Sequence, residues 1–287
     1  MRWFRCKMMS RSYWIVAVSA ALTILYTINL AMPKAMPSEV VSAIAYITIL
    51  SITTASFHQA LKVSGWGFRD RLMRAFSMAV IGFALWFAAK LLNAIYTVIV
   101  GVEPPYPSQI DAIWVLGCIF LILGLWSYTS KFKILWREAA EPLKHLITLT
   151  PVAVFFTVTM ISLAAVNPFK LINVDPLEAS MDFTYTILDS ILLSLAILNL
   201  LLFRRGILGR VWALISGGVA LGMLLDLLSL QGFMETWYYW GHPVEILAIW
   251  GFTLAALGAN LYAETFRPSK QETGNYASTS SRKIKRY

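Results

Sequence analysis

Three charged residues lie within strongly apolar stretches of the chain: Lys90, Asp189 and Asp226. A lone charge in a bilayer costs about 3 kcal/mol on insertion scales, so such residues face a partner or a water-filled cavity. We expect Lys90 and Asp226 to form an ion pair, with Asp189 as a further ligand or ion-pair candidate. The pair either only fixes helix register, because desolvation offsets the Coulomb attraction, or lines an outward-opening cavity that binds a polar group or relays a proton. In a third arrangement, Lys90 snorkels outward.

Polar residues also precede two of the apolar stretches. In the run PPYPSQIDAIW at 104–114, Ser108 can cap a helix, and Asp111 three residues later completes a capping box. The run HPVE at 242–245 likewise places a proline at the first helical position and an acid in the first turn. Alternatively, four residues form a polar outer rim that gates or recognises a ligand: Ser108, Asp111, His242 and Glu245.

Signatures of a catalytic or metal site are missing from the sequence. Cys6 is predicted in the cytoplasm and Cys118 within a helix, and no pair of histidines has the depth and spacing for haem. Ser-His, Cys-His, paired-Asp and HExxH patterns are not found at a convincing depth. We therefore expect no enzymatic activity, no metal and no cofactor. Retinal attached to Lys90, with Asp226 as counter-ion, is disfavoured.

The composition requires most of the chain to lie in lipid. Of its 287 residues, 58% are hydrophobic and 14% are charged, and the mean hydropathy is +0.66. A helix that spans the roughly 30 Å hydrocarbon core needs about 20 mainly apolar residues. Eight stretches meet this criterion: 13–31, 40–61, 72–100, 111–129, 146–166, 183–203, 210–232 and 244–264. The predicted fold class is all-α, a polytopic integral membrane protein of about eight transmembrane helices.

Basic residues predict the orientation of these helices. Twenty-one of the 24 Lys and Arg residues fall in the termini and in every second loop, and the others are Lys34, Lys90 and Lys170. Because such residues stay on the cytoplasmic side, we predict a multi-pass cell-membrane protein with both termini cytoplasmic. Anionic lipid accounts for the net charge of +9, so the expected partner is the bilayer and not a nucleic acid. Residues 1–31 also resemble a signal peptide, but we interpret them as a retained helix.

An internal repeat relates two halves of the chain. At a shift of 136 residues, the aligned residues are Arg74, Phe76, Gly82 and Lys90 with Arg210, Trp212, Gly218 and Asp226. At a shift of 134, they are Asp111, Gly117, Gly124 and Tyr128 with Glu245, Gly251, Gly258 and Tyr262. Four helices per copy give both copies the same orientation, which is a 4+4 parallel repeat. Its glycine stripes favour close helix packing.

The repeat divides the chain into five predicted segments. They are a cytoplasmic N-terminus (1–12), a first four-helix repeat (13–131), a cytoplasmic linker (132–145), a second four-helix repeat (146–266) and a disordered basic cytoplasmic tail (267–287).

The run PPYPSQIDAIWVLGCIFLILGLW resembles the Pro-x-Pro-Ser-x-x-Asp-x-x-Tyr-x-x-Gly pattern of multi-helix membrane sensor regions in prokaryotes, which precede diguanylate cyclase or histidine kinase domains. The run MDFTYTILDSILLSLAIL is similar to another helix of such regions. Trp114 stands where the family often has Tyr, and no output domain is attached here. The resemblance implies a sensory or scaffold module that binds a small ligand from the outer face and acts through an unidentified membrane or cytoplasmic partner.

A small-solute or proton-coupled transporter is the alternative function. The predicted duplication and the buried charge pair favour it, since many transporters consist of repeats around a site in the membrane. Alternating access also needs a path at both faces, and the sequence has no Gly/Pro-broken helix in mid-membrane to provide one.

Overall fold

Helices form nearly all of the chain that the structure describes. The computed structural model describes residues 2–31, 37–65, 68–130, 141–165, 175–202, 206–234, 238–239 and 242–267. The elements in this part are α1 (Arg2–Ala31), α2 (Ser38–Ser64), α3 (Arg71–Ala94), the π-helix η1 (Ile95–Val100), α4 (Gln109–Thr129), α6 (Glu141–Ala165), α8 (Pro176–Leu202), α9 (Gly206–Met234), the 3₁₀ helix η3 (Pro243–Glu245) and α10 (Ile246–Thr265). The same residues include no strand, so the all-α fold class is confirmed.

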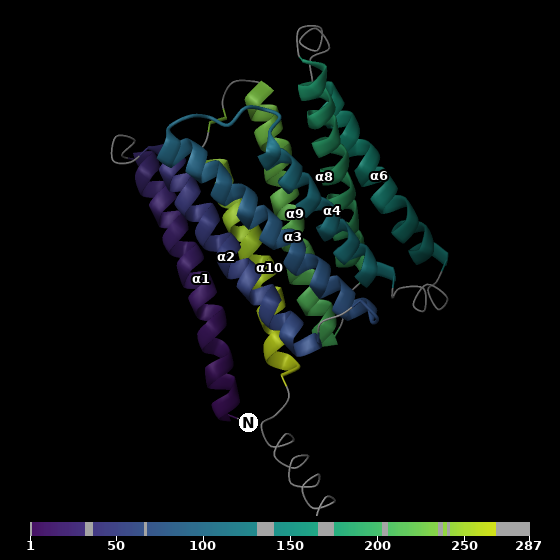
Figure 1. Ribbon diagram of the computed structural model, residues 1–287. Coiled ribbons are helices and arrows are strands. Elements are labelled where there is room, and N and C mark those ends of the chain that lie inside the picture. The colour runs from purple at the N-terminus through teal and green to yellow at the C-terminus, as the bar shows by residue number, and fades with distance from the viewer. Residues whose placement is uncertain are drawn as a thin grey trace, which may run out of the picture.

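Seven helical segments in this part are long and apolar enough to cross a membrane. They are Ser12–Asn29, Ser38–Ser64, Arg71–Val100, Gln109–Thr129, Pro176–Leu202, Gly206–Ser229 and Pro243–Thr265. The seven helices are those of a multi-pass membrane protein. The remaining predicted span, 146–166, falls on α6, which lies alongside α8 (Figure 1). Among the residues described, the apolar stretch of α6 is only Thr148–Thr157, so a total of eight spans stays a prediction.

Several boundaries differ from those predicted. The helix α1 begins at Arg2, so residues 2–12 are helical. The predicted third span divides into α3 and η1, and Gly101 ends η1 with a left-handed φ of 72° that glycine adopts without strain. Of the predicted linker (132–145), the structure describes only residues 141–145, which form the start of α6. Of the predicted tail (267–287), it describes only Arg267.

Side-chain caps begin two of the helices. At the start of α3, Asp70 Oδ2 accepts the backbone N–H of Leu72 at 2.8 Å. At the start of α4, the Ser108 hydroxyl accepts the N–H of Ile110 at 3.2 Å, and Asp111 Oδ2 accepts the N–H of Ser108 at 2.7 Å. The predicted capping box of Ser108 and Asp111 is therefore confirmed.

Six helices pack in a closed ring. In order, α2 contacts α3, α3 contacts α4, α4 contacts α8, α8 contacts α9, α9 contacts α10, and α10 contacts α2. Outside the ring, α1 packs on α10 and α2, while α6 packs on α8 and α9. Successive helices run in alternate directions, and the start of α1 lies at the same end of the bundle as the end of α10 (Figure 1). We call this the basic end, because Lys62 and Arg71 lie there at the α2 and α3 termini. The opposite end, where α4 begins at Asp111, is the acidic end.

Glycines allow two helix pairs to approach closely. A Cβ atom added to Gly82 of α3 would lie 3.0 Å from the carbonyl oxygen of Gly117 of α4. In the other pair, a Cβ atom added to Gly218 of α9 would lie 2.3 Å from the carbonyl oxygen of Gly251 of α10. A side chain at these positions would push the helices apart. In lipid, helices associate through this kind of close van der Waals contact.

Aromatic side chains join the two pairs across the middle of the ring. Phe76 of α3 packs on Tyr262 of α10 with 4.5 Å between ring centroids, and Tyr128 of α4 stacks on Trp212 of α9 at 3.8 Å. Phe76 and Trp212 are themselves 5.5 Å apart. All four rings are buried, so α3, α4, α9 and α10 share one core.

Polar contacts hold α1 on α10. Asn260 Nδ2 donates to the Ser12 hydroxyl at 3.2 Å, and the hydroxyls of Ser19 and Thr253 are 2.5 Å apart. Ser12 and Ser19 are seven residues apart, or two helical turns, so they lie on one face of α1. The α1 span is the least buried of the seven. Hydrogen bonds between helices therefore contribute much of its attachment.

Replacing Gly218 with alanine tests the glycine contact. We expect Gly218→Ala to lower the free energy of unfolding by about 1–3 kcal/mol, because the added methyl group meets backbone atoms that cannot move alone. The matched control is Gly217→Ala on the same helix, where a Cβ atom meets nothing within 4 Å. Thermal unfolding in detergent measures both variants. Equal unfolding temperatures for the two would contradict this account of the α9–α10 contact.

Candidate ligand site around Lys90 and Glu245

The side chain of Lys90 points from α3 into a polar, aromatic-lined space. Its Nζ lies 4.3 Å from the ring centroid of Tyr46 on α2 and 5.3 Å from that of Trp114 on α4. Trp114 in turn stacks on Trp86 at 4.7 Å, and Trp86 Nε1 donates to the Trp114 carbonyl at 3.2 Å. A cation over aromatic faces is stabilised by the ring quadrupoles, more strongly where water is excluded. Lys90 is therefore held inside the bundle and does not extend outward into lipid.

The most buried acid of the site is Glu245, which is 0% exposed. Its Oε2 accepts the hydroxyls of Tyr26 at 2.5 Å and Ser42 at 2.7 Å, and its Oε1 accepts the Tyr238 hydroxyl at 2.9 Å. Tyr26 follows Ser19 on α1 by seven residues, so this bond continues the polar face of α1. Three hydroxyl groups therefore donate to one carboxyl group, and both of its oxygens have hydrogen-bond partners inside the bundle.

Tyr238 remains a hydroxyl donor in this arrangement. It precedes the last span, and burial, reinforced by the neighbouring Glu245 carboxylate, raises its pKa well above the ordinary value. The phenol therefore stays neutral at physiological pH and keeps its proton for Glu245. Next to it, His242 caps η3 by accepting the N–H of Val244 on Nδ1 at 3.2 Å.

Lys90 interacts with two acids and not with one. Its ammonium group is influenced electrostatically by Glu245 and, to a smaller extent, by Asp226 on α9. Asp226 is half-buried and interacts in turn with Asp189 on α8. The predicted proximity of Lys90 and Asp226 is therefore seen inside the bundle, and Glu245 is a second acid that acts on the same ammonium group. Asp189 joins this set through Asp226.

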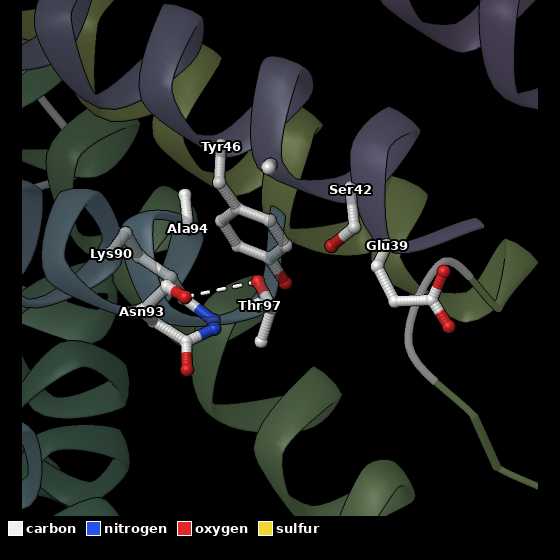
Figure 2. A pocket seen from close by; sticks show the side chains of 8 residues that line it. Glu39, Ser42, Tyr46, Lys90, Asn93, Ala94 and Thr97 are labelled. Atoms are coloured by element: carbon white, nitrogen blue, oxygen red, sulfur yellow. Dashed lines mark hydrogen bonds between the residues drawn. The ribbon is translucent and has the colours of Figure 1, made fainter. Parts of the chain in front are cut away.

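A small hollow lies beside Lys90, between α2 and α3. Figure 2 shows its lining, which consists of Glu39, Ser42, Ala43, Tyr46, Lys90, Asn93, Ala94 and Thr97. Its space of about 20 Å³ is enough for one water molecule. The lining runs from the exposed Glu39 to Lys90 and includes the junction of α3 with η1. π-Helical turns occur frequently at functional sites, because they redirect side chains within a helix.

The predicted outer rim is not one structure. Asp111 is half-buried and accepts the Tyr185 hydroxyl of α8 on Oδ1 at 2.9 Å, in addition to capping α4 with Ser108. His242 caps η3. Glu245 is fully buried among Tyr26, Ser42 and Tyr238, so its predicted place at the outer rim is wrong. Capping was the right interpretation for Ser108 and Asp111.

Asp189 is buried within the bundle, at 8% exposure. The residues that sequence reasoning missed are Tyr26, Ser42, Tyr46 and Tyr238, which surround Glu245 and Lys90. The only signal in the sequence was the presence of hydroxyl groups near the same end of several predicted helices. Among the described residues, no group of three or more His, Cys, Asp or Glu side chains could hold a metal ion.

Comparison with known proteins finds no matching family model, no similar curated protein and no similar solved structure. The geometry around Lys90 and Glu245 is therefore the basis for assigning a function.

Three variants measure how much the interactions of Lys90 with Asp226 and Glu245 contribute to the free energy of unfolding. We expect Lys90→Met to lower the free energy of unfolding by about 3–5 kcal/mol, because it leaves buried carboxyl groups without their cation. Asp226→Asn should cost less, since Glu245 continues to balance Lys90. The double variant should recover only part of the Lys90→Met loss, because Glu245 still lacks a cation. Denaturant unfolding in detergent measures all three variants. Equal losses in the two single variants with full recovery in the double variant would show that Lys90 and Asp226 balance each other without Glu245.

Proposed function

We propose that the protein is an integral membrane sensory module that binds a small polar ligand at the acidic end and acts through a partner protein. The observation that carries this proposal is the hollow beside Lys90, whose lining extends from the exposed Glu39 to the half-buried Lys90. Lys90 offers a cation, while Ser42, Asn93 and Thr97 offer hydroxyl and amide groups beside it. Ligand pockets commonly combine apolar walls with a few such convergent polar groups.

The ligand class follows from the charges of the lining. An oxyanion, such as a carboxylate or phosphate group, would be attracted to Lys90 and would compete with Glu245 for it. Because the hollow holds only about 20 Å³, the bound group is small or the wall formed by α3 and η1 moves to admit it. We infer that only the polar head of the ligand enters the hollow.

The helix α1 is our candidate for passing on the signal. Glu245 accepts hydrogen bonds from both Tyr26 of α1 and Ser42 of the hollow. A ligand that draws Lys90 away would weaken the interaction of Glu245 with this cation and so change the hydrogen bond between Glu245 and Tyr26. The changed bond would shift Tyr26 and, with it, α1, whose span is the least buried of the seven. The shift of α1 would reach the basic end. A membrane or cytoplasmic partner would contact the protein there.

We also propose that the chain is a 4+4 duplication with eight spans. Residues at aligned positions make equivalent contacts: Gly82 with Gly117, and Gly218 with Gly251. The aligned aromatic pairs cross between halves in the same way, Phe76 with Tyr262 and Trp212 with Tyr128. Both chain ends would then lie on one side of the cell membrane, and the positive-inside rule makes this side cytoplasmic. The acidic end would face outward.

Filling the hollow tests the ligand proposal. Purified protein in lipid nanodiscs is screened by thermal unfolding against small carboxylates, phosphates and amines. A compound that binds should stabilise the wild type, by about 2.7 kcal/mol at 100 times its Kd, and should bind Thr97→Leu at least tenfold more weakly. The matched control is Thr27→Leu, because both threonines donate to the carbonyl four residues earlier and Thr27 is exposed. Equal stabilisation of Thr97→Leu would place the binding site elsewhere.

A small-solute or proton-coupled transporter is the second candidate. The chain of interacting charges from Glu245 through Lys90 and Asp226 to Asp189 favours it, because transporters bind substrates and protons at such groups. In proteoliposomes with a pH-sensitive dye inside, a transporter should dissipate an imposed proton gradient. We expect this flux to be lost in Asp226→Asn, provided the variant keeps its wild-type unfolding temperature. Absence of flux in the wild type with every tested solute would leave the sensory function.

A further inference from the structure

The buried acid Asp189 has one carboxyl oxygen without a hydrogen bond. Among the residues that the structure describes, no donor reaches its Oδ1, and the residue is more than nine-tenths buried. The next residue, Ser190, is fully buried, and its hydroxyl donates to the Thr186 carbonyl at 2.7 Å and so turns away from Asp189. An ionised carboxylate without donors in a low-dielectric interior costs far more than a neutral carboxylic acid. The unsatisfied oxygen therefore favours the neutral, protonated form of Asp189.

Among the described residues, the charged group that acts on Asp189 is an acid and not a cation. On α9, Asp189 faces Asp226, a second acid. On α4 the neighbouring titratable group is Cys118, which is buried and uncharged as a thiol. On α6 the described contact is Thr159, whose hydroxyl is 3.4 Å from that of Ser190. The ammonium group of Lys90 interacts with Glu245 and with Asp226.

We propose that Asp189 and Asp226 form a proton-binding site, in which one proton is held by the pair and resides on Asp189. Two carboxyl groups that share a buried place do not both ionise, because like charges repel strongly there. With the proton on Asp189, Asp226 remains the anion that faces Lys90, and Lys90 is balanced by Glu245 and Asp226. Asp189 exchanges its proton with water when the bundle opens locally.

The proton site has a consequence for the hollow. Loss of the proton adds a negative charge next to Asp226 and increases the pull of α8 and α9 on the ammonium group of Lys90. Lys90 then shifts its interaction from Glu245 toward Asp226. The site thus links pH to the charge beside the hollow. The proposal rests on the buried, unsatisfied carboxyl oxygen of Asp189 and on the contact between α8 and α9. It does not require that the hollow bind a ligand.

Infrared spectroscopy tests the proton site directly. A protonated carboxyl group gives a C=O stretching band that is separate from the bands of carboxylates. At neutral pH in lipid nanodiscs, the wild type should show this band with an intensity of about one carboxyl group per chain, and ²H₂O should shift it. The band should be absent from Asp189→Asn, which mimics the neutral acid. Asp111→Asn is the control, because Asp111 accepts hydrogen bonds from Ser108 and Tyr185, and it should keep the band.

Stability measurements separate this site from the alternatives. Asp189→Asn should unfold at the wild-type temperature or above it, since it replaces one neutral group with another. A band that persists in Asp189→Asn would overturn the assignment. So would a wild type without the band whose unfolding temperature rises with Na⁺ while that of Asp189→Asn does not, because the pair would then hold a cation. Ligand binding in the hollow is measured separately, so failure of either proposal leaves the other standing.

Discussion

The need to neutralise charge inside a helix bundle governs the arrangement of this protein. Lys90 is the cation that interacts with Glu245 and Asp226, and Asp226 interacts in turn with Asp189. An unbalanced charge in such surroundings costs several kcal/mol. This constraint explains why four different elements, α3, α8, α9 and η3, each contribute one ionisable side chain to this interacting set. It also explains the surroundings of Lys90, since the Tyr46 and Trp114 rings stabilise a cation without adding a further negative charge.

Under the proposed duplication, the two halves keep their packing residues and differ in their charged ones. The glycine pairs Gly82–Gly117 and Gly218–Gly251 set the distance between helices in both halves. A change at one of them would move a whole helix, whereas a charge can change if a complementary charge changes with it. A duplicated pair of like residues at the Lys90 position would have repelled each other. Lys90 and Asp226, at the two aligned positions, instead attract each other because their charges are opposite.

Patterns within one helix predicted the structure well, and contacts between helices did not follow from them. Seven of the predicted spans are found as apolar helices, and the capping box of Ser108 and Asp111 is local, so spacing alone identified it. The same local spacing led to the wrong place for Glu245. Its position in a first helical turn predicts a helix end, but it does not show which side chains cover the residue. Its donor Tyr26 comes from α1, 219 residues away in the chain. The burial of Asp189 likewise depends on how α8 packs against α4, α6 and α9.

Glu245 belongs both to the site and to the attachment of α1. Ser12, Ser19 and Tyr26 follow one another at intervals of seven residues. They bond successively to Asn260 and Thr253 of α10 and to Glu245 of η3, directly before α10. The first two contacts join neutral groups, and only the third includes an ionisable one. A change in the charge balance of Lys90 therefore acts on α1 at one end of this polar face, while the contacts nearer the basic end remain. The physical result is a helix whose attachment is sensitive to charge at the acidic end and insensitive to it elsewhere.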